Sequence, residues 1–144
     1  MDIWDYFERH QRECRSLGLV ESDNFPIQYF AMEGRNDMRG LILGRYDLGD
    51  RAFVGVKEVV EIVEGNYPQR VQYAYYLIVD GFEEFARERD PSHHPAVHGH
   101  GRGHRWEPAE PITFVRFVNE AWDRVSDLPD ESLADESLGG GIAP

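Results

Sequence analysis

Apolar residues near the N-terminus recur with the spacing of one helix face. Between residues 2 and 17 they fall three or four positions apart, which predicts an amphipathic helix that buries Ile3, Tyr6, Phe7, His10, Cys14 and Leu17. Asp2 stands at the start of this pattern, where its side chain can cap the first turn. Gly18 follows it and suits the left-handed conformation that ends many helices. His10 on the apolar face is expected to be a packing residue.

The pattern then changes to the two-residue alternation of β-strands. Five strands are predicted, separated by turns rich in Gly, Asp, Asn and Pro, over residues 25–33, 38–47, 51–64, 69–80 and 82–89. In the third strand valines and an isoleucine point one way, whereas Lys57 and Glu61 point the other. Charged side chains on one side indicate an antiparallel sheet with a solvated face. Short strands joined by tight turns favour a meander over βαβ units.

The last third of the chain divides into three segments. Residues 90–111 contain four prolines, three glycines and five histidines, and we expect a loop without regular structure there. Residues 111–125 carry an apolar stripe behind a proline, which predicts a second helix. Residues 126–144 are acidic and poor in large apolar side chains, so a disordered tail is expected. The predicted fold class is α+β: a single domain over residues 1–125, with a five-stranded antiparallel meander flanked by an N-terminal and a C-terminal helix.

Length and cysteine content restrict the class of protein. The chain has 144 residues, which suits one domain with one core. No apolar run approaches the ~20 residues of a membrane span, and the N-terminus has no signal-peptide pattern, so we expect a cytoplasmic protein. Cys14 is the only cysteine, which excludes an internal disulfide and a cysteine-based zinc site within one chain.

The charge is unevenly distributed along the chain. The formal net charge is −12, which by itself disfavours nucleic acid as a partner, and −7 remains without the acidic residues of the tail. Residues 87–105 are the exception, because Arg87, Arg89, Arg102 and Arg105 face only two acidic residues. Phosphate contact depends on charges within a Debye length of ~8–10 Å, so this local excess matters more than the total.

Five of the six histidines lie in the same segment: His93, His94, His98, His100 and His104. An imidazole titrates near neutral pH, so two of them can serve as base and acid around a 2′-hydroxyl and a departing 5′-oxygen. A neighbouring arginine would stabilise the extra charge of the transition state. Cleavage by this route needs no metal and requires RNA rather than DNA.

Two other interpretations of the histidines stay open. His94 with His98, and His100 with His104, have the i, i+4 spacing of metal ligands, and Asp90 could complete a set for zinc or another divalent ion. Glycines at 99, 101 and 103 disfavour the helix that this spacing requires. The segment could also be a flexible tract without chemistry.

The basic segment also resembles a known family. The residues that carry the resemblance are Arg87, Arg89, Asp90, His93, His94, Pro95, His98, His100, His104, Glu107 and Pro108. Their order looks like the C-terminal signature of the TumE toxins of bacterial and archaeal toxin–antitoxin systems. The N-terminal helix, the meander and the aromatic strand at residues 73–76 are similar to that family as well.

The resemblance implies a growth-inhibiting endoribonuclease that a cognate antitoxin with a DNA-binding domain neutralises. It implies proton transfer by His93, His94 and His98, with Arg87 on the phosphate. Further predicted substrate contacts are Arg89, Arg102 and Arg105, with Tyr75 stacking on a base or orienting a histidine. The alternative is a non-catalytic accessory or immunity-type domain that binds a protein and whose histidine loop holds a metal or the partner. A homodimer is compatible with both.

Overall fold

The computed structural model describes residues 1–32, 38–64, 67–92, 95–101 and 106–129. Its elements in chain order are α1 (Ile3–Ser16), β1 (Val20–Glu21), β2 (Gln28–Met32), β3 (Arg39–Asp47), β4 (Ala52–Val63), β5 (Tyr67–Val79), β6 (Phe82–Arg89), β7 (Val97–His100), β8 (Trp106–Pro108) and α2 (Phe114–Ser126). The eight strands form one antiparallel sheet in the order β1-β3-β4-β5-β6-β7-β8, and β2 also pairs with β3. The α+β class and the meander are confirmed, but five strands was too few.

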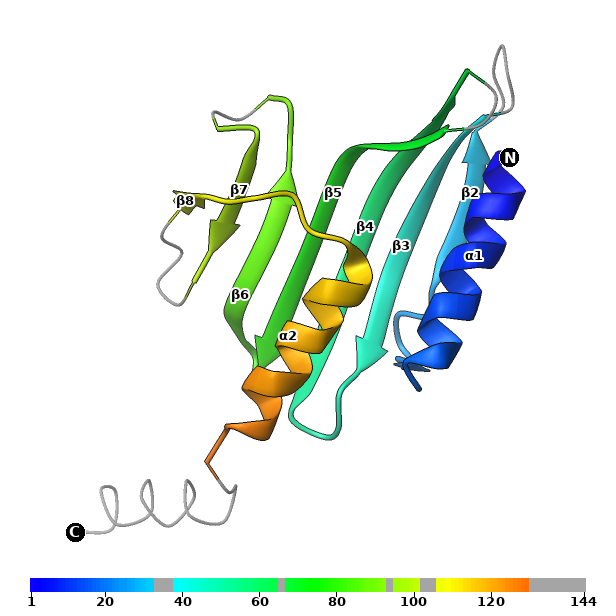
Figure 1. The fold of residues 1–144 in the computed structure, drawn as a ribbon. Coiled ribbons are helices and arrows are strands. Elements are labelled where there is room, and N and C mark those ends of the chain that lie inside the picture. The colour runs from blue at the N-terminus through cyan, green and yellow to red at the C-terminus, as the bar shows by residue number, and fades with distance from the viewer. Residues whose placement is uncertain (33–37, 65–66, 93–94, 102–105, 130–144) are drawn as a thin grey trace, which may run out of the picture.

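Both helices lie on the same face of the sheet (Figure 1). α1 buries the predicted residues from Ile3 to Cys14 against β2, β3 and β4, and Asp2 forms a reciprocal capping box with Asp5. α2 crosses β4 and β5 and buries Phe117 and Val118. The core therefore fills the space between the helices and one side of the sheet, and among the described residues no helix covers the other side.

The start of α2 differs from the sequence-based prediction. The helix begins at Phe114 rather than at Pro111, because the Thr113 side chain caps it by accepting a hydrogen bond from the Arg116 backbone. At its end the chain stays packed through residue 129: Leu128 lies against the core, and Arg51 donates to the Pro129 carbonyl at 2.8 Å. The predicted tail beyond these residues, 130–144, lies outside the described part.

Two irregularities in the strand pairing decide which side chains face the helices. Between β4 and β5 the register skips Val71, so that Arg70 pairs with the inward-facing Val60. Between β5 and β6 it skips Glu84, so that Arg87 pairs with the inward-facing Tyr75. Arg70 and Arg87 consequently lie on the helix side of the sheet.

The prediction that residues 90–111 form a loop without regular structure is wrong in part, because this stretch contains two short strands. Val97–His100 pairs with β6, and Trp106–Pro108 pairs with β7. These short strands satisfy the backbone groups of the β6 edge, and the prolines do not prevent it, since Pro108 sits on the outermost strand where no donor is required.

Neither helix in the described part of the chain is long and apolar enough to cross a membrane.

Candidate functional site

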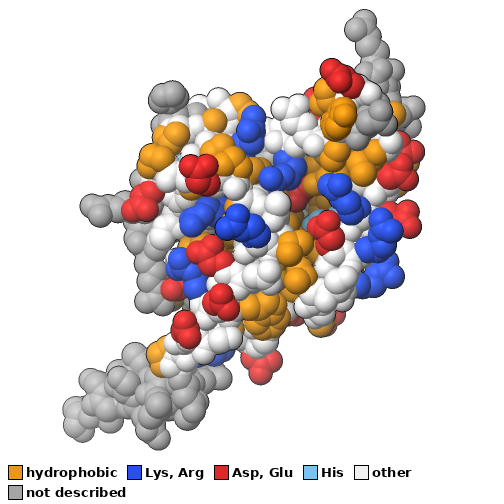
Figure 2. Space-filling view, in the orientation of Figure 1, with side chains coloured by type: hydrophobic (Ala, Val, Ile, Leu, Met, Phe, Trp, Pro, Cys, Tyr) orange, Lys and Arg blue, Asp and Glu red, His pale blue; other side chains and the backbone are white. Residues whose placement is uncertain are grey.

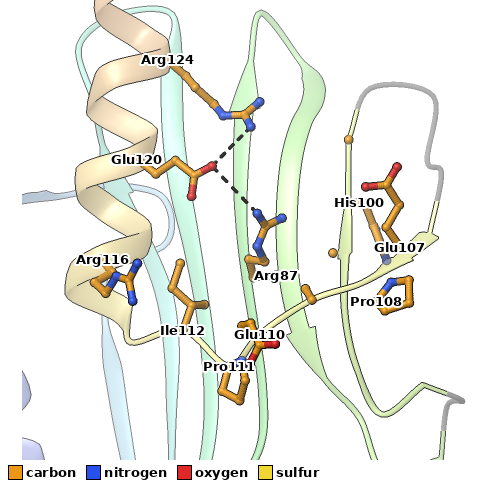
Figure 3. A pocket seen from close by; sticks show the side chains of 13 residues that line it. Arg87, His100, Glu107, Pro108, Glu110, Pro111, Ile112, Arg116, Glu120 and Arg124 are labelled. Carbon is orange, nitrogen blue, oxygen red and sulfur yellow. Dashed lines mark hydrogen bonds and ion pairs between the residues drawn. The ribbon is translucent and has the colours of Figure 1, made fainter.

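Arginines from β6 and α2 converge on the helix side of the sheet (Figure 3). Arg87 extends from β6 with its guanidinium 5.8 Å from the Phe85 ring, and its Nη2 lies 3.9 Å from a carboxylate oxygen of Glu120. Arg124 reaches the same oxygen at 3.3 Å and stacks over Phe85 at 4.0 Å. One carboxylate thus lies between two guanidinium groups.

These side chains line a groove of about 420 Å³, which we call the arginine groove. His100, its two neighbouring glycines and residues 108–112 form part of its lining. The charged lining comprises three arginines and three glutamates: Arg87, Arg116, Arg124, Glu107, Glu110 and Glu120. The three α2 residues stand four positions apart and so share one helix face. In the space-filling view of the helix side, basic side chains gather over this region with acidic ones among them (Figure 2).

Gly99 leaves the space that Arg87 occupies. It pairs directly with Arg87, and a Cβ atom there would lie 2.5 Å from Arg87 Nη1 and 3.2 Å from the Ala86 carbonyl. A side chain at position 99 would have to push the guanidinium away. The absence of a side chain at position 99 therefore allows Arg87 to take its position.

The two described histidines of the segment lie on the opposite face of the sheet. His98 pairs with Glu88, and His100 pairs with Ala86, so both alternate with Arg87 and Gly99. The predicted combination of Arg87 and His98 at one phosphate is corrected by this register, because the sheet separates the two side chains. His98 is also fully buried, which disfavours direct proton transfer to a substrate.

The other predicted site residues divide into described and undescribed ones. Arg89 faces the helix side like Arg87, and its Nε is buried and makes no hydrogen bond within the described residues. Asp90 accepts hydrogen bonds from the backbone and hydroxyl of Ser92 and so shapes the β6–β7 connection. The remaining ones lie outside the described part of the chain: His93, His94, Arg102, His104 and Arg105.

Tyr75 is part of a buried polar network rather than of a surface. Its hydroxyl donates to Glu58 Oε2 at 2.5 Å and accepts from Arg70 Nη1 at 2.9 Å, while the Tyr6 hydroxyl donates to Glu58 Oε1 at 2.5 Å. Glu58 is 2% exposed and Tyr75 is fully buried. Burial and the facing carboxylate raise the pKa of Tyr75. Neither face of the Tyr75 ring is open for stacking on a base, because the rings of Tyr73, Phe114 and Phe117 pack around it.

This network borders a smaller pocket of about 190 Å³ between the two helices. His10 lies beside it, 3.3 Å from the Tyr46 hydroxyl and 3.4 Å from the Cys14 sulfur. Burial lowers the pKa of His10, against the opposing effect of the Glu58 charge. Burial also raises the pKa of Cys14 to about 11, which leaves the thiol protonated and unreactive at neutral pH.

The lowered pKa of His10 predicts a pH dependence of stability. Below the ordinary pKa of ~6.5 the unfolded chain takes up a proton that folded His10 does not, so the free energy of unfolding falls as the pH drops. One such group contributes a slope of at most about 1.4 kcal/mol per pH unit. Between pH 7.5 and pH 5, urea titrations of His10→Gln should show a shallower decline than the wild type. Equal slopes would show that His10 titrates alike in both states.

Some of the functional residues that were not predicted can be recognised from the sequence pattern. Glu58 stands in the inward-facing row of β4 between Val56 and Val60, and a carboxylate in such a row points to a buried network. The four-residue spacing of Arg116, Glu120 and Arg124 likewise identifies a charged helix face. Arg70 has no such signal, since only the bulge at Val71 turns it inward.

Comparisons of the chain with models of protein families, with curated proteins and with solved structures gave no match. A function is therefore inferred from the geometry of the arginine groove and of the buried network around Glu58.

Proposed function

We propose that this protein is the RNA-cleaving toxin of a toxin–antitoxin pair and that the arginine groove holds the RNA backbone. One observation carries the proposal: Arg87 and Arg124 approach a single carboxylate oxygen of Glu120 from two elements. An anion thus already sits between two guanidinium groups, and guanidinium is the side-chain group best suited to bind phosphate. Arg116 stands one turn away, exposed at the groove.

The continuity of β6 supports the assignment of the chemistry. Arg87 and Arg89 face the groove side, and the strand then passes through Asp90 into the connection that carries His93 and His94. His93 and His94 lie outside the described residues, and we propose on sequence grounds that their imidazoles act as base and acid. Because the route begins at the 2′-hydroxyl, it is specific for RNA, and it is metal-independent because the two imidazoles supply the base and the acid. The cognate antitoxin would act by covering this side.

Growth after expression tests the catalytic part. Wild-type protein should arrest growth and degrade total RNA within minutes to hours, whereas His93→Ala and His94→Ala should each lose about 10²–10⁴-fold in cleavage rate and permit growth. His10→Gln is the matched control, since it changes a histidine outside the segment. Arrest by the His93/His94 double variant at wild-type level would refute the chemistry.

RNA binding tests the groove separately from cleavage. With a labelled single-stranded RNA and the His93→Ala background, Arg87→Ala or Arg124→Ala should weaken binding and lower the slope of log K against log salt by about 0.7 each. Glu120→Gln should tighten binding, because it removes the carboxylate that competes with phosphate. Arg12→Ala, exposed on α1, is the control. If Glu120→Gln weakens binding as much as the arginine variants, the groove is not a phosphate site.

A second candidate function has one observation in its favour. On the side of the sheet that neither helix covers, Phe30 is 47% and Leu43 is 40% exposed, and Met32 lies on the same strand face. Such apolar exposure is typical of an interaction surface and suits a non-catalytic accessory or immunity-type domain. Harmless expression with intact RNA, together with self-association that Leu43→Ser abolishes in sedimentation velocity, would favour this function instead.

A further inference from the structure

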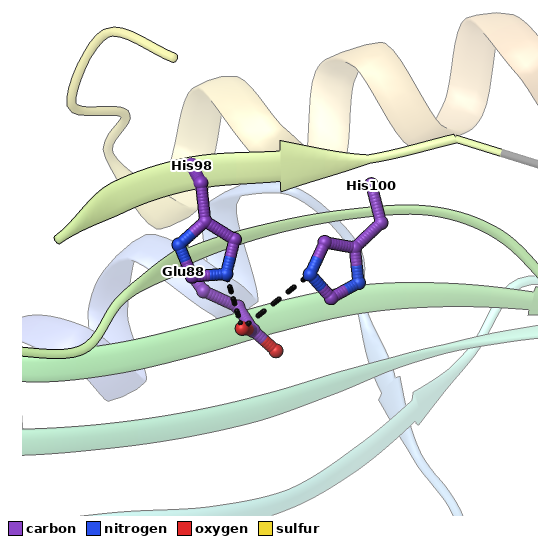
Figure 4. Close-up of side chains that lie close together, drawn as sticks. All are labelled: Glu88, His98 and His100. Carbon is purple, nitrogen blue, oxygen red and sulfur yellow. Dashed lines mark hydrogen bonds and ion pairs between the residues drawn. The ribbon is translucent and has the colours of Figure 1, made fainter. Parts of the chain in front are cut away.

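Three metal-ligating side chains meet on the face of the sheet opposite the arginine groove. The pairing of β6 with β7 sets Glu88 across from His98 and beside His100 (Figure 4). Glu88 Oε2 lies 2.9 Å from His98 Nε2 and 3.7 Å from His100 Nε2, and one ligand atom of each residue lies within 4.8 Å of the others. Ligands around a tetrahedral zinc ion are about 3.3 Å apart, given bonds of ~2.0–2.1 Å. The cluster therefore needs little adjustment to hold one ion.

The other nitrogen of each imidazole is held by an acceptor. His98 Nδ1 lies 3.2 Å from the Pro95 carbonyl oxygen, and His100 Nδ1 lies 3.5 Å from Glu83 Oε2. A proton on each Nδ1 would be donated to these oxygens, which leaves both Nε2 lone pairs directed at the same region. Metal-bound histidines almost always have this arrangement, in which a carbonyl or carboxylate fixes the tautomer and the ring orientation.

The surroundings of the cluster also suit an ion. The side chains of His98, His100 and Glu88 are 0%, 11% and 25% exposed, and the two rings stack 5.1 Å apart with nearly parallel planes. Buried charges in proteins are paired or coordinate metals. Here a single carboxylate oxygen faces two imidazole nitrogens, and His98 Nε2 lies within hydrogen-bond distance of it. A cation bound between them would be coordinated by all three atoms.

We propose that Glu88, His98 and His100 bind a divalent transition metal ion, zinc by preference, which fastens β7 to β6. Imidazole nitrogens select zinc and its neighbours over magnesium and calcium, and two histidines with one carboxylate leave a fourth position for water. The ligand set differs from the one that the histidine spacing suggested, since Glu88 takes the place of Asp90. The sheet lies between the Glu88 and His98 side chains and Arg87, whereas His100 also lines the arginine groove. The inference rests on the geometry of the three ligands and not on the proposed RNA cleavage.

Zinc binding to the purified, chelator-treated full chain tests the proposal. Competition with a chromogenic chelator should show one tight equivalent, and zinc should raise the melting temperature of the wild type. Glu88→Gln and His100→Gln should each weaken binding more than 100-fold, whereas Glu83→Gln, which only releases His100 Nδ1, should weaken it about 10-fold. Circular dichroism of each variant shows whether it has folded. Cobalt in place of zinc should give a tetrahedral absorption spectrum in the wild type that Glu88→Gln lacks.

Matched variants separate this site from the rest of the histidine segment. Asp90→Asn and the double variant His94→Ala/His104→Ala should keep the tight equivalent. If these variants abolish it while folded Glu88→Gln binds as the wild type does, an adventitious histidine tract holds the ion and the proposal is overturned. It is equally overturned if the wild type shows no saturable equivalent. Failure of zinc binding and failure of the proposed RNA cleavage are distinguished because His93→Ala/His94→Ala tests the cleavage and Glu88→Gln tests the metal.

Discussion

Glu58→Ala is expected to lower the free energy of unfolding by about 3–5 kcal/mol. The substitution removes the acceptor of two buried hydroxyls, those of Tyr6 and Tyr75. It also leaves the half-buried Arg70 without the nearby negative charge, although its hydrogen bonds to Tyr75 and the Ile112 carbonyl remain. A buried donor without an acceptor costs about 1–3 kcal/mol, and here two arise at once. Urea unfolding followed by tryptophan fluorescence measures the loss.

Three further variants make this expectation specific to the network. Glu58→Gln keeps the shape and one acceptor, so it should lose less than Glu58→Ala. Glu61→Ala removes an exposed glutamate from the same strand and should change stability by less than about 0.5 kcal/mol. The double variant Tyr6→Phe/Glu58→Ala should lose less stability than the sum of the losses in the two single variants. Each single substitution already removes one end of the same hydrogen bond. A Glu58→Ala protein as stable as Glu61→Ala would show that the network contributes nothing to folding.

The parts of the fold that local pattern determines were predictable. α1 and the central strands β3 to β6 follow from spacing, caps and turns, because each buries one side against the same core. What the pattern could not show is the pair of bulges at Val71 and Glu84. Each shifts the alternation by one residue, and a shift of one residue moves every following side chain to the other face.

The place of the polar clusters in the chain was predictable, but their geometry was not. Residues 87–100 do carry the polar clusters, as the histidines and arginines indicated. The division of the segment between two faces depends on β7 being a strand, and the glycines and prolines argued against one. Long-range pairing with the β6 edge outweighed those local preferences, and it turned Arg87 toward α2 while it turned His98 toward Glu88.

β6 therefore serves two sites through simple alternation. Its odd-numbered residues Arg87 and Arg89 face the helix side, and Glu88 between them faces the histidines. An ion bound by Glu88 would hold β7, and β7 carries the Gly99 that gives Arg87 its space. Loss of the ion is thus expected to disturb the groove through β7.

Phe117→Ala is expected to cost about 3–5 kcal/mol of stability and to remove RNA binding as well. Phe117 is fully buried in α2, where its ring stacks on Phe85 at 4.6 Å and approaches Tyr75 at 5.7 Å. The contact joins α2 to both β5 and β6. Truncation leaves a cavity beneath the helix that positions Arg116 and Arg124, so the arginine groove should lose one of its two walls.

Two measurements distinguish loss of the groove from simple unfolding. Val115→Ala lies in the same helix but is only partly buried, so it should lower stability much less and keep RNA affinity. For Phe117→Ala, RNA affinity is measured at a temperature where circular dichroism shows the chain still folded. Because β6 and β7 do not depend on α2 for their pairing, zinc binding at Glu88 should persist there while RNA binding falls. Retention of wild-type RNA affinity by folded Phe117→Ala would show that the packing of Phe117 is not required to position the arginines of α2.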